Sequence, residues 1–169
     1  TAKAGQLIFD MSSSYPPSTV RLGELLKAKG INFLDAPVSG GVRGAVSGKL
    51  TVMIGGDEHL FEKWEELLRV FGTNIFHIGT LGMGHTLKAL NNLLSASSLL
   101  ATSEVIILAT RLGLDTNRVI EVLNQSTGQS NATETKFPEF ILPKTFDSGF
   151  TVGLLRKDTS IAPRLAKDE

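Results

Sequence analysis

Hydrophobic and polar residues alternate along the first half of the chain in the manner of an α/β domain. Apolar runs of strand length recur at residues 6–11, 31–38, 49–54 and 74–78. Between them, apolar positions at helical spacing predict helices at 18–29 and 58–71. Ser18 and Asp57 are the candidate N-caps of these two helices. Strands that alternate with helices predict a layered α/β domain that extends to Gly79.

Beyond this point the pattern is helical only. The segment 84–112 has no proline and no glycine after its first residue, so a rise of about 1.5 Å per residue predicts a rod of about 40 Å. An apolar stripe follows the rod at spacings of three and four: Leu87, Leu90, Leu94, Ala101, Val105, Leu108 and Leu112. Shorter helices are expected at 115–123, 137–142 and 161–166. We therefore expect two domains, 1–81 and 82–169, of which the second is all-α.

Composition excludes several classes of function. The 169 residues carry 17 Lys+Arg and 17 Asp+Glu, so no net field favours nucleic acid. The absence of cysteine excludes disulfides, thiolate nucleophiles and sulfur-ligated metals. The three histidines have no mutual ligand spacing and no carboxylate cluster, so we expect no metal site.

The most hydrophobic window, 93–109, contains Glu104 and several serines, which argues against a membrane span. We expect a protein of the cytoplasm or the mitochondrial matrix with no membrane partner. The first strand pattern opens almost at residue 1 and the last helical pattern runs to the final residues, so we also expect a piece of a longer protein.

A candidate anion-binding turn follows the apolar run 31–38. Its sequence is Ser39-Gly40-Gly41, and unhindered backbone N–H groups in such a turn can converge on an anion. On composition alone an ordinary loop is the simpler interpretation. The position at the end of a strand favours a site, because open α/β sheets bind ligands there.

A candidate acid–base group lies on the first turns of the long helix. Lys88, Asn91 and Asn92 are polar residues on a helix that is otherwise largely apolar. A lysine in apolar surroundings can lose its charge near neutral pH and serve as an acid or a base. A polar stripe on a buried helix needs partners or a purpose, so these residues are candidates for handling a small hydroxy acid.

Two nucleotide-binding patterns fail on inspection. The sequence Gly82-Met83-Gly84-His85-Thr86-Leu87 has leucine where the dinucleotide fingerprint requires its third glycine. The segment 41–49 has the length of a phosphate-binding loop, but Arg43 stands where that loop needs glycine and Leu50 replaces its Ser/Thr.

Five motifs in order resemble those of the β-hydroxyacid dehydrogenases, which include 3-hydroxyisobutyrate dehydrogenase, tartronate semialdehyde reductase and 6-phosphogluconate dehydrogenase. The motifs are Asp10-Met11-Ser12-Ser13, Asp35-Ala36-Pro37-Val38-Ser39-Gly40-Gly41, Gly48-Lys49-Leu50-Thr51-Val52-Met53-Ile54-Gly55-Gly56, Gly82-x-Gly84-x-x-x-Lys88-x-x-Asn91-Asn92 and Gly149-Phe150…Lys157-Asp158. The resemblance implies the C-terminal part of a Rossmann-type domain, then a long interdomain helix and an all-α domain that helps to form a dimer or tetramer. It also implies that the family's N-terminal βαβ unit, with its glycine-rich cofactor loop, is missing.

The resemblance also implies roles for individual residues. Lys88 matches the catalytic lysine, and Asn91 and Asn92 cover the amide that orients the substrate, with the choice between them open. The turn Ser39-Gly40-Gly41 matches the segment that holds the substrate carboxylate. Two further residues match positions near the cofactor, which would be NAD or NADP: Ser13 and Lys157.

These roles define a hypothesis for the reaction. The nicotinamide carries the hydride, and Lys88 takes the hydroxyl proton of a small 3-hydroxy acid. Three alternatives stay open: an imine reductase, a non-catalytic scaffold and an isolated helical dimerisation module. The first two branches typically lack this lysine, so its presence favours the dehydrogenase.

Overall fold

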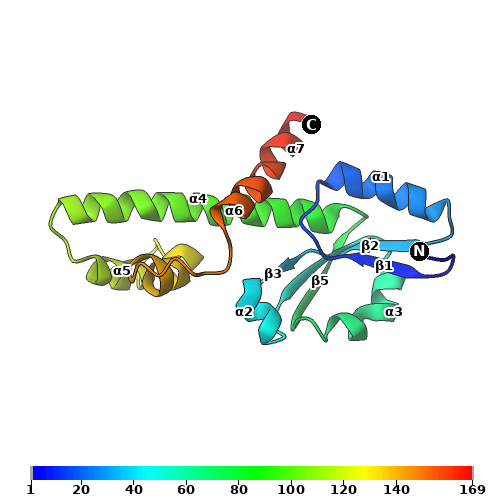
Figure 1. Cartoon of the computed structure of the whole chain (residues 1–169), viewed down its shortest axis with the longest axis horizontal. Helices are drawn as coiled ribbons and strands as arrows, with labels where there is room; N and C mark the ends of the chain where they lie inside the picture. The colour runs from blue at the N-terminus through cyan, green and yellow to red at the C-terminus, as the bar shows by residue number, and fades with distance from the viewer. Residues whose placement is uncertain (1, 169) are drawn as a thin grey trace. The chain divides into compact units, whose positions relative to one another are not determined.

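The structure is a computed structural model that describes residues 2–168 (Figure 1). The chain divides into two compact units. The first comprises Thr1–Leu90 together with Ser160–Glu169, and the second comprises Asn91–Thr159. The border between the units falls inside the longest helix. The proposed domain division at residue 81 stays a prediction.

A five-stranded sheet forms the centre of the first unit. Its strands are β1 (Leu7–Asp10), β2 (Asn32–Asp35), β3 (Val38–Ser39), β4 (Thr51–Gly55) and β5 (Asn74–Gly79). β1 is parallel to β2 and β4 is parallel to β5, whereas β4 runs antiparallel to β2 and β3. The parallel pair sets Asp10 beside Asp35, each as the last residue of its strand.

The single strand expected at 31–38 is two strands in the structure. β2 meets β4 where Asp35 pairs with Gly55, and β3 meets β4 where Val38 pairs with Val52. Pro37 lies between them and has no N–H to give to a ladder, although its carbonyl accepts the Met53 N–H at 3.0 Å. β2 and β3 therefore follow the same side of β4, one after the other.

The side chains of the sheet alternate between two faces. One face packs on α3 (Glu58–Leu68) in a core that consists of Leu34, Ala36, Val52, Ile54 and Leu68. On the other face, Phe33 lies next to Gly23 of α1 (Pro16–Lys27), and the Met53 carbonyl lies next to Gly84. Because the alternation has a period of two, Asp35 belongs to this second face.

The helix ends confirm one predicted cap and correct another. Asp57 caps α3, where its Oδ1 accepts the Leu60 N–H at 2.9 Å. Ser18 lies inside α1, whose N-cap is Tyr15. The helix begins earlier than expected because proline at the first helical position, here Pro16, has its φ already set and needs no N–H partner. α3 ends at Leu68, three residues before the predicted end.

Two further helices complete the first unit. The sequence did not predict α2 (Gly41–Val46), whereas α7 (Ile161–Asp168) confirms the helix expected at 161–166. The Arg164 guanidinium of α7 stacks over the Tyr15 ring at 3.8 Å from its centroid, which attaches the last described segment to the start of α1.

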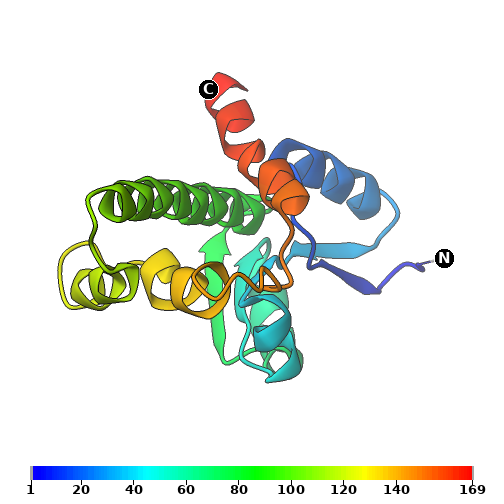
Figure 2. The ribbon, with the colours of Figure 1, turned by 60° about the vertical axis from the view of Figure 1, so that its left-hand side comes forward.

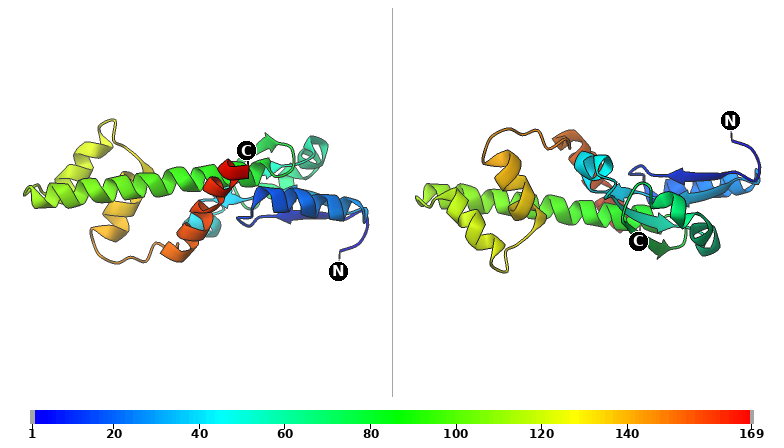
Figure 3. Two further views of the ribbon diagram at one scale, coloured as in Figure 1. Left: turned by 90° about the horizontal axis from the view of Figure 1, so that it is seen from above. Right: turned by 90° about the horizontal axis from the view of Figure 1, so that it is seen from below.

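The long helix α4 (Met83–Arg111) confirms the predicted rod, and it is continuous in both views of Figure 3. Its burial differs from the expectation. Within the chain alone the leucine stripe is exposed, with Leu94 70% and Leu112 69% accessible. The buried positions of α4 are Gly84, His85, Lys88, Ala89, Asn92, Thr102, Ile106 and Ala109. The predicted polar residues thus lie on the more buried side of the helix.

α4 also meets the length and composition conditions for a membrane-crossing helix, with a mean hydropathy of 1.6 in its most apolar window. Core helices of soluble proteins meet the same conditions. The expectation that this helix does not span a membrane rests on Glu104 and the serines within it, and it stays a prediction.

The second unit is helical, as expected. Besides most of α4 it contains α5 (Thr116–Asn124), a wide π-type helix η1 (Ala132–Ile141) and α6 (Val152–Thr159). Figure 2 shows α5 and η1 next to each other. Their core consists of Ile106, Ile120, Ala132 and Phe137. η1 begins at Ala132, five residues before the helix expected at 137–142, and the sequence did not predict α6.

Candidate active site

Lys88 lies on the second turn of α4 and is only 8% exposed. A lysine on the solvent side of a surface helix would be mostly exposed, so the ordinary interpretation of this residue does not hold. Asn92 lies one helical turn further along α4 and is 7% exposed, whereas Asn91 is half-buried. The spacing of four residues sets Lys88 and Asn92 on the same side of the helix.

The turn after β3 has the backbone that the sequence predicts for an anion-binding turn. Gly40 and Gly41 have φ values of 127° and 60°, which favour glycine over any residue with a side chain. A Cβ at Gly40 would also come within 3.1 Å of the Leu50 side chain. Both glycines are exposed and Ser39 is half-buried, so the backbone of this turn is accessible.

Lys88 and Ser39 are both attached to the same part of β4. Gly84, one turn before Lys88, packs against the Met53 carbonyl, and Pro37, two residues before Ser39, accepts the Met53 N–H. A helical turn advances about 5.4 Å. Two strand residues advance about 7 Å. The lysine helix and the glycine turn therefore start from one point of the sheet, which favours the predicted pairing of Lys88 with residues 39–41.

The serine turn after β1 is organised by Asp10. The Ser12 hydroxyl and the Ser12 N–H donate to Oδ1 of Asp10 at 2.6 and 3.0 Å, and the Ser14 hydroxyl donates to Oδ2 at 3.3 Å. Burial alone would raise the pKa of Asp10, but the bonds from Ser12 and Ser14 and the nearby His85 outweigh it and lower the pKa below its usual value. Ser13, the predicted cofactor contact, is half-buried in this turn.

A buried pair that the sequence reasoning missed joins these elements. Asp35 is 0% exposed, and its two oxygens accept the N–H groups of Gly82 and His85, each at 2.7 Å. The His85 ring reaches the Ser12 carbonyl through Nε2 at 3.1 Å and the Thr19 hydroxyl through Nδ1 at 2.8 Å. One signal was available, because Asp35 is a charged residue inside the strand predicted at 31–38.

A second polar cluster belongs to the other unit. Asp158 is buried, with Oδ2 accepting from Nδ2 of Asn92 at 2.9 Å and Oδ1 lying 2.6 Å from Nζ of Lys157. The Asn91 side chain in turn donates to Oδ1 of Asn92 at 3.4 Å. Lys157 and Asp158 are thus more than an ordinary exposed pair, since the carboxylate is buried. The structure joins three of the predicted site residues, Asn91, Asn92 and Lys157, through this carboxylate.

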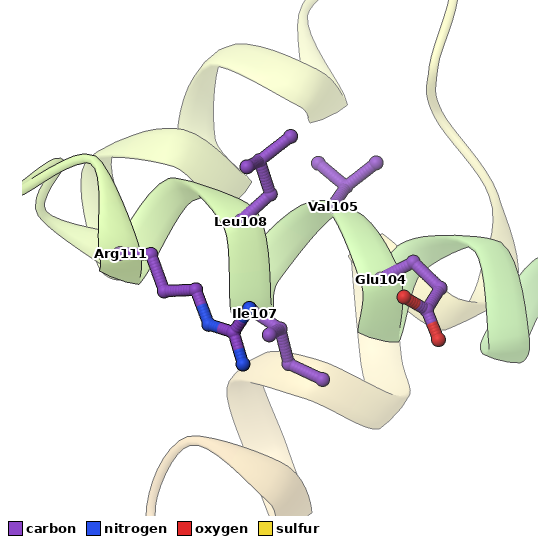
Figure 4. A pocket seen from close by; sticks show the side chains of 5 residues that line it. All are labelled: Glu104, Val105, Ile107, Leu108 and Arg111. Carbon is purple, nitrogen blue, oxygen red and sulfur yellow. The ribbon is translucent and has the colours of Figure 1, made fainter.

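One surface hollow lies away from the predicted site residues. A hollow beside α4 is lined by Glu104, Val105, Ile107, Leu108 and Arg111, and it contains none of the predicted site residues (Figure 4). Among residues 2–168, no group of three His, Asp or Glu side chains is clustered closely enough to hold a metal ion.

Together, the sheet, the glycine turn at its edge and the long helix that follows define an α/β fold of the Rossmann type with a helical extension. Comparison with known families agrees with this class. Residues 82–169 match the family model described as the NAD-binding domain of NADP-dependent 3-hydroxyisobutyrate dehydrogenase, and residues 1–79 match the NAD-binding domain of 6-phosphogluconate dehydrogenase. The chain belongs to the β-hydroxyacid dehydrogenase family.

Individual relatives agree. The chain is 40% identical over 166 residues to 2-(hydroxymethyl)glutarate dehydrogenase of Eubacterium barkeri, covering 98% of this chain and 55% of that protein. It is 38% identical over 163 residues to 2-hydroxy-3-oxopropionate reductase of Escherichia coli, covering 96% and 56%. A solved structure of Mycobacterium tuberculosis 3-hydroxyisobutyrate dehydrogenase with L-serine superposes with a TM-score of 0.90 at 31% identity, covering 99% of this chain and 60% of that one. The chain spans about half the length of the curated relatives it matches.

Both matched domains bind nicotinamide dinucleotides, so the family confirms NAD or NADP as the cofactor class. The residues of this chain fit one side of such a molecule. The last residues of the parallel strands β1 and β2 lie side by side, and hydroxyl groups follow them at Ser12 and Ser14. Open α/β sheets bind cofactors outside this edge. Over the described residues, the fingerprint with three glycines occurs at none of the turns between a strand and a helix, because Leu87 interrupts the one near match.

Proposed function

We propose that the whole protein carrying this chain is an NAD(P)-dependent dehydrogenase of small 3-hydroxy acids, with Lys88 as its general acid–base. The observation that carries the proposal is a lysine only 8% exposed, one turn beyond the point where α4 packs on β4, next to the strand that leads to the glycine turn. Burial disfavours the charged form of a lysine, which suits such a residue to accept and return a proton near neutral pH.

In the oxidative direction the bound nicotinamide accepts a hydride from the carbon that bears the hydroxyl group. Lys88, neutral before the reaction, takes the hydroxyl proton, so that the alcohol becomes a carbonyl compound and the amine becomes an ammonium. In the reductive direction the ammonium returns the proton. The backbone N–H groups of Ser39-Gly40-Gly41 bind the carboxylate of the hydroxy acid, which fixes the reacting carbon relative to the lysine.

Of the two candidate amides, we propose that Asn92 binds the reacting oxygen. It is buried on the same side of α4 as Lys88, and its orientation is fixed because Nδ2 donates to Asp158 while Oδ1 accepts from Asn91. The second hydrogen on Nδ2 can therefore donate to a substrate oxygen. Asn91 then supports Asn92. Ser13 and Lys157 are proposed to lie on the nicotinamide side of the cofactor.

The test is an assay of the whole protein with a panel of 3-hydroxy acids and both nicotinamides. Lys88→Met should lower kcat by about 10²- to 10⁴-fold, as expected for the loss of a general acid–base, and leave cofactor binding nearly intact. Lys63→Met, at an exposed lysine on α3, is the matched control and should keep wild-type turnover. A Lys88→Met protein with near-normal kcat would refute the proposal, and a wild-type protein that binds cofactor but turns over no hydroxy acid would favour a scaffold.

We also propose that a second copy of the protein covers the exposed side of α4. The exposed leucines and valine along this side, Leu87, Leu90, Leu94, Val105, Leu108 and Leu112, form a continuous apolar stripe at helical spacing. Such a stripe is characteristic of a subunit interface, and a two-fold axis would pair it with itself. Light scattering after size exclusion should give twice the protomer mass, or four times if dimers associate further. A monomer at micromolar concentration would refute this.

A further inference from the structure

We propose that Asp35, together with His85, is a positioning residue for Lys88, an inference that rests on the proposed function. Asp35 is fully buried and on β2, four residues before Ser39 of the glycine turn. Its two oxygens each bind a backbone N–H at the start of α4, from Gly82 and from His85 at 2.7 Å. Lys88 follows His85 by three residues, so the carboxylate fixes the turn of helix that carries it.

The two bonds satisfy donors that the helix itself leaves without partners. The first N–H groups of an α-helix have no intrahelical acceptor, and a negative charge at this end is favoured by the helix dipole. The first helical bond of the i→i−4 kind in this region is from the Thr86 N–H to the Gly82 carbonyl at 2.9 Å. Asp35 therefore replaces the missing partners with a group that belongs to the sheet, whereas an ordinary cap belongs to the helix's own first turn.

The close approach of helix and sheet depends on two glycines. A Cβ at Gly84 would overlap the Met53 carbonyl and lie 2.8 Å from Oδ2 of Asp35, and a Cβ at Gly55 would overlap Oδ1 of Asp35. Only residues without a side chain allow β4, the carboxylate and the helix to meet at this distance. The helix start is thus held by packing as well as by hydrogen bonds.

His85 extends the same connection to the serine turn. The Ser12 carbonyl can only accept, so Nε2 carries a hydrogen, and in the neutral ring Nδ1 accepts from the Thr19 hydroxyl. Asp35 and Asp10 also flank the ring, with Oδ2 of Asp35 3.7 Å from Nδ1 and Oδ2 of Asp10 4.0 Å from Nε2. One buried pair thus joins the serine turn, proposed to lie on the nicotinamide side, to the helix of Lys88, and Asp35 itself belongs to the strand that precedes β3 and the glycine turn. A small displacement of such a framework is costly, because an error of about 1 Å at reacting atoms lowers rates by about a hundredfold.

The decisive variant is Asp35→Asn in the whole protein. Asparagine keeps the size, but its Nδ2 would face one of the two N–H donors, so one bond is lost. We expect kcat to fall by about tenfold to a hundredfold, because Lys88 is displaced. The KM for the cofactor should change by less than about twofold, because Asp10 still organises the serine turn.

The chain offers matched controls. Asp57 and Asp115 cap α3 and α5, accepting the N–H groups of Leu60 at 2.9 Å and Arg118 at 2.8 Å, and neither helix carries a proposed catalytic residue. Asparagine is as good a cap as aspartate at an exposed helix start, so Asp57→Asn and Asp115→Asn should keep kcat. An equal loss of kcat in all three variants would show a general effect on folding and overturn the proposal.

A double substitution distinguishes positioning from simple structural support. If Asp35 acts through the lysine, Asp35→Asn should lower turnover little further in a protein that already carries Lys88→Met. Independent multiplication of the two losses would overturn the inference. If Lys88→Met itself keeps normal kcat, the proposed function fails; if Lys88→Met loses kcat while Asp35→Asn keeps it, only the positioning role fails.

A milder variant covers the case in which Asp35→Asn does not fold. Thr19→Val removes the hydroxyl bonded to Nδ1 of His85 at a position only 3% exposed and keeps both bonds of Asp35. We expect a folded protein whose kcat is lowered by about threefold to tenfold with an unchanged cofactor KM. Wild-type kcat in Thr19→Val would overturn the role of His85 and with it the proposal.

Discussion

The first turns of α4 differ from its later turns in what they contact within the chain. At the start, a fully buried carboxylate accepts two backbone N–H groups and glycines allow the sheet within contact distance. Further along, leucines such as Leu94 and Leu108 are mostly exposed in the chain alone. The start of the helix is held by directional bonds and close packing, whereas the later turns bury one side, through Ile106 and Ala109, and leave a row of leucines exposed.

The difference shows that one helix can serve two purposes in separate segments. The first segment needs a fixed geometry, because the proposed acid–base lies there, and small residues with directional bonds provide it. The second segment needs only an apolar surface of regular spacing, which is what a partner subunit requires. If this is correct, substitutions in the first segment should lower the free energy of unfolding, and substitutions in the second should weaken subunit association.

The largest effect is expected from adding a methyl group at the start of α4. Gly84→Ala would force a Cβ onto the Met53 carbonyl, so we expect the free energy of unfolding to fall by about 3 kcal/mol or more. The measurement is urea unfolding of the full chain. Gly153→Ala in α6 is the control: its Cβ would meet nothing closer than 3.9 Å, and a gain of about 0.5–1 kcal/mol is expected from helix propensity. Equal losses at both sites would contradict the comparison.

A charge on the exposed stripe should weaken assembly without harming the protomer. Leu94→Glu introduces a carboxylate that a subunit interface would have to bury unpaired, so we expect the dimer to dissociate at micromolar concentration. Scattering measures the mass, and circular dichroism checks that the protomer is still helical. Val70→Glu makes the same change at a 70% exposed position outside α4 and should leave the mass unchanged. A dimer that survives Leu94→Glu places the interface elsewhere.

The side-chain N-caps of α3 and α5 should contribute about equally to the free energy of unfolding, one in each unit. Asp57→Ala and Asp115→Ala each remove one side-chain acceptor at an exposed helix start, and each should cost about 1 kcal/mol of unfolding free energy. Chemical unfolding of the two single variants makes the comparison. A cost several times larger at one of the two caps would mean that the units differ in more than the start of α4.

The smallest effect concerns the stability of the fold at low pH. The pKa of Asp10 is lowered from 3.8 in the fold, so its ionised form contributes stability at pH values above about 3.8 that is lost as the pH falls through the lowered pKa. Asp10→Asn should therefore reduce stability at neutral pH and make the acid unfolding transition less steep below about pH 4. Unfolding free energies measured between neutral pH and acid test this, and identical pH profiles for the two proteins would refute it.

The sequence predicted what depends on local pattern. The strands, the rod of α4 and the cap at Asp57 follow from spacing and from a single side chain that reaches its own helix. It could not predict the division between β2 and β3, which depends on how Pro37 meets β4. It predicted the leucine stripe but not its exposure, because periodicity shows that a helix has two sides but not which side the chain itself covers.

Within the candidate site, motif spacing identified Lys88 and the glycine turn, and the structure adds that the lysine is buried. Asp35 was not recognised because its partners, Gly82 and His85, are backbone donors 47 and 50 residues away. Every residue except proline has a backbone N–H, so the type of the partner residue does not indicate such a bond. Asp158 was underestimated for a different reason: its partner is the Asn92 side chain, 66 residues away in the sequence.

Gly55 and Gly84 leave no space for a side chain where α4 meets β4. A related protein with a different acid as substrate would therefore keep both glycines and differ in residues near the glycine turn. The nearest variable part is α2, a short helix that begins at Gly41 of the glycine turn and whose exposed residues include Val42, Arg43 and Val46. Diversification should therefore be sought in those few outward-facing positions, while Lys88, the proposed acid–base, keeps its position.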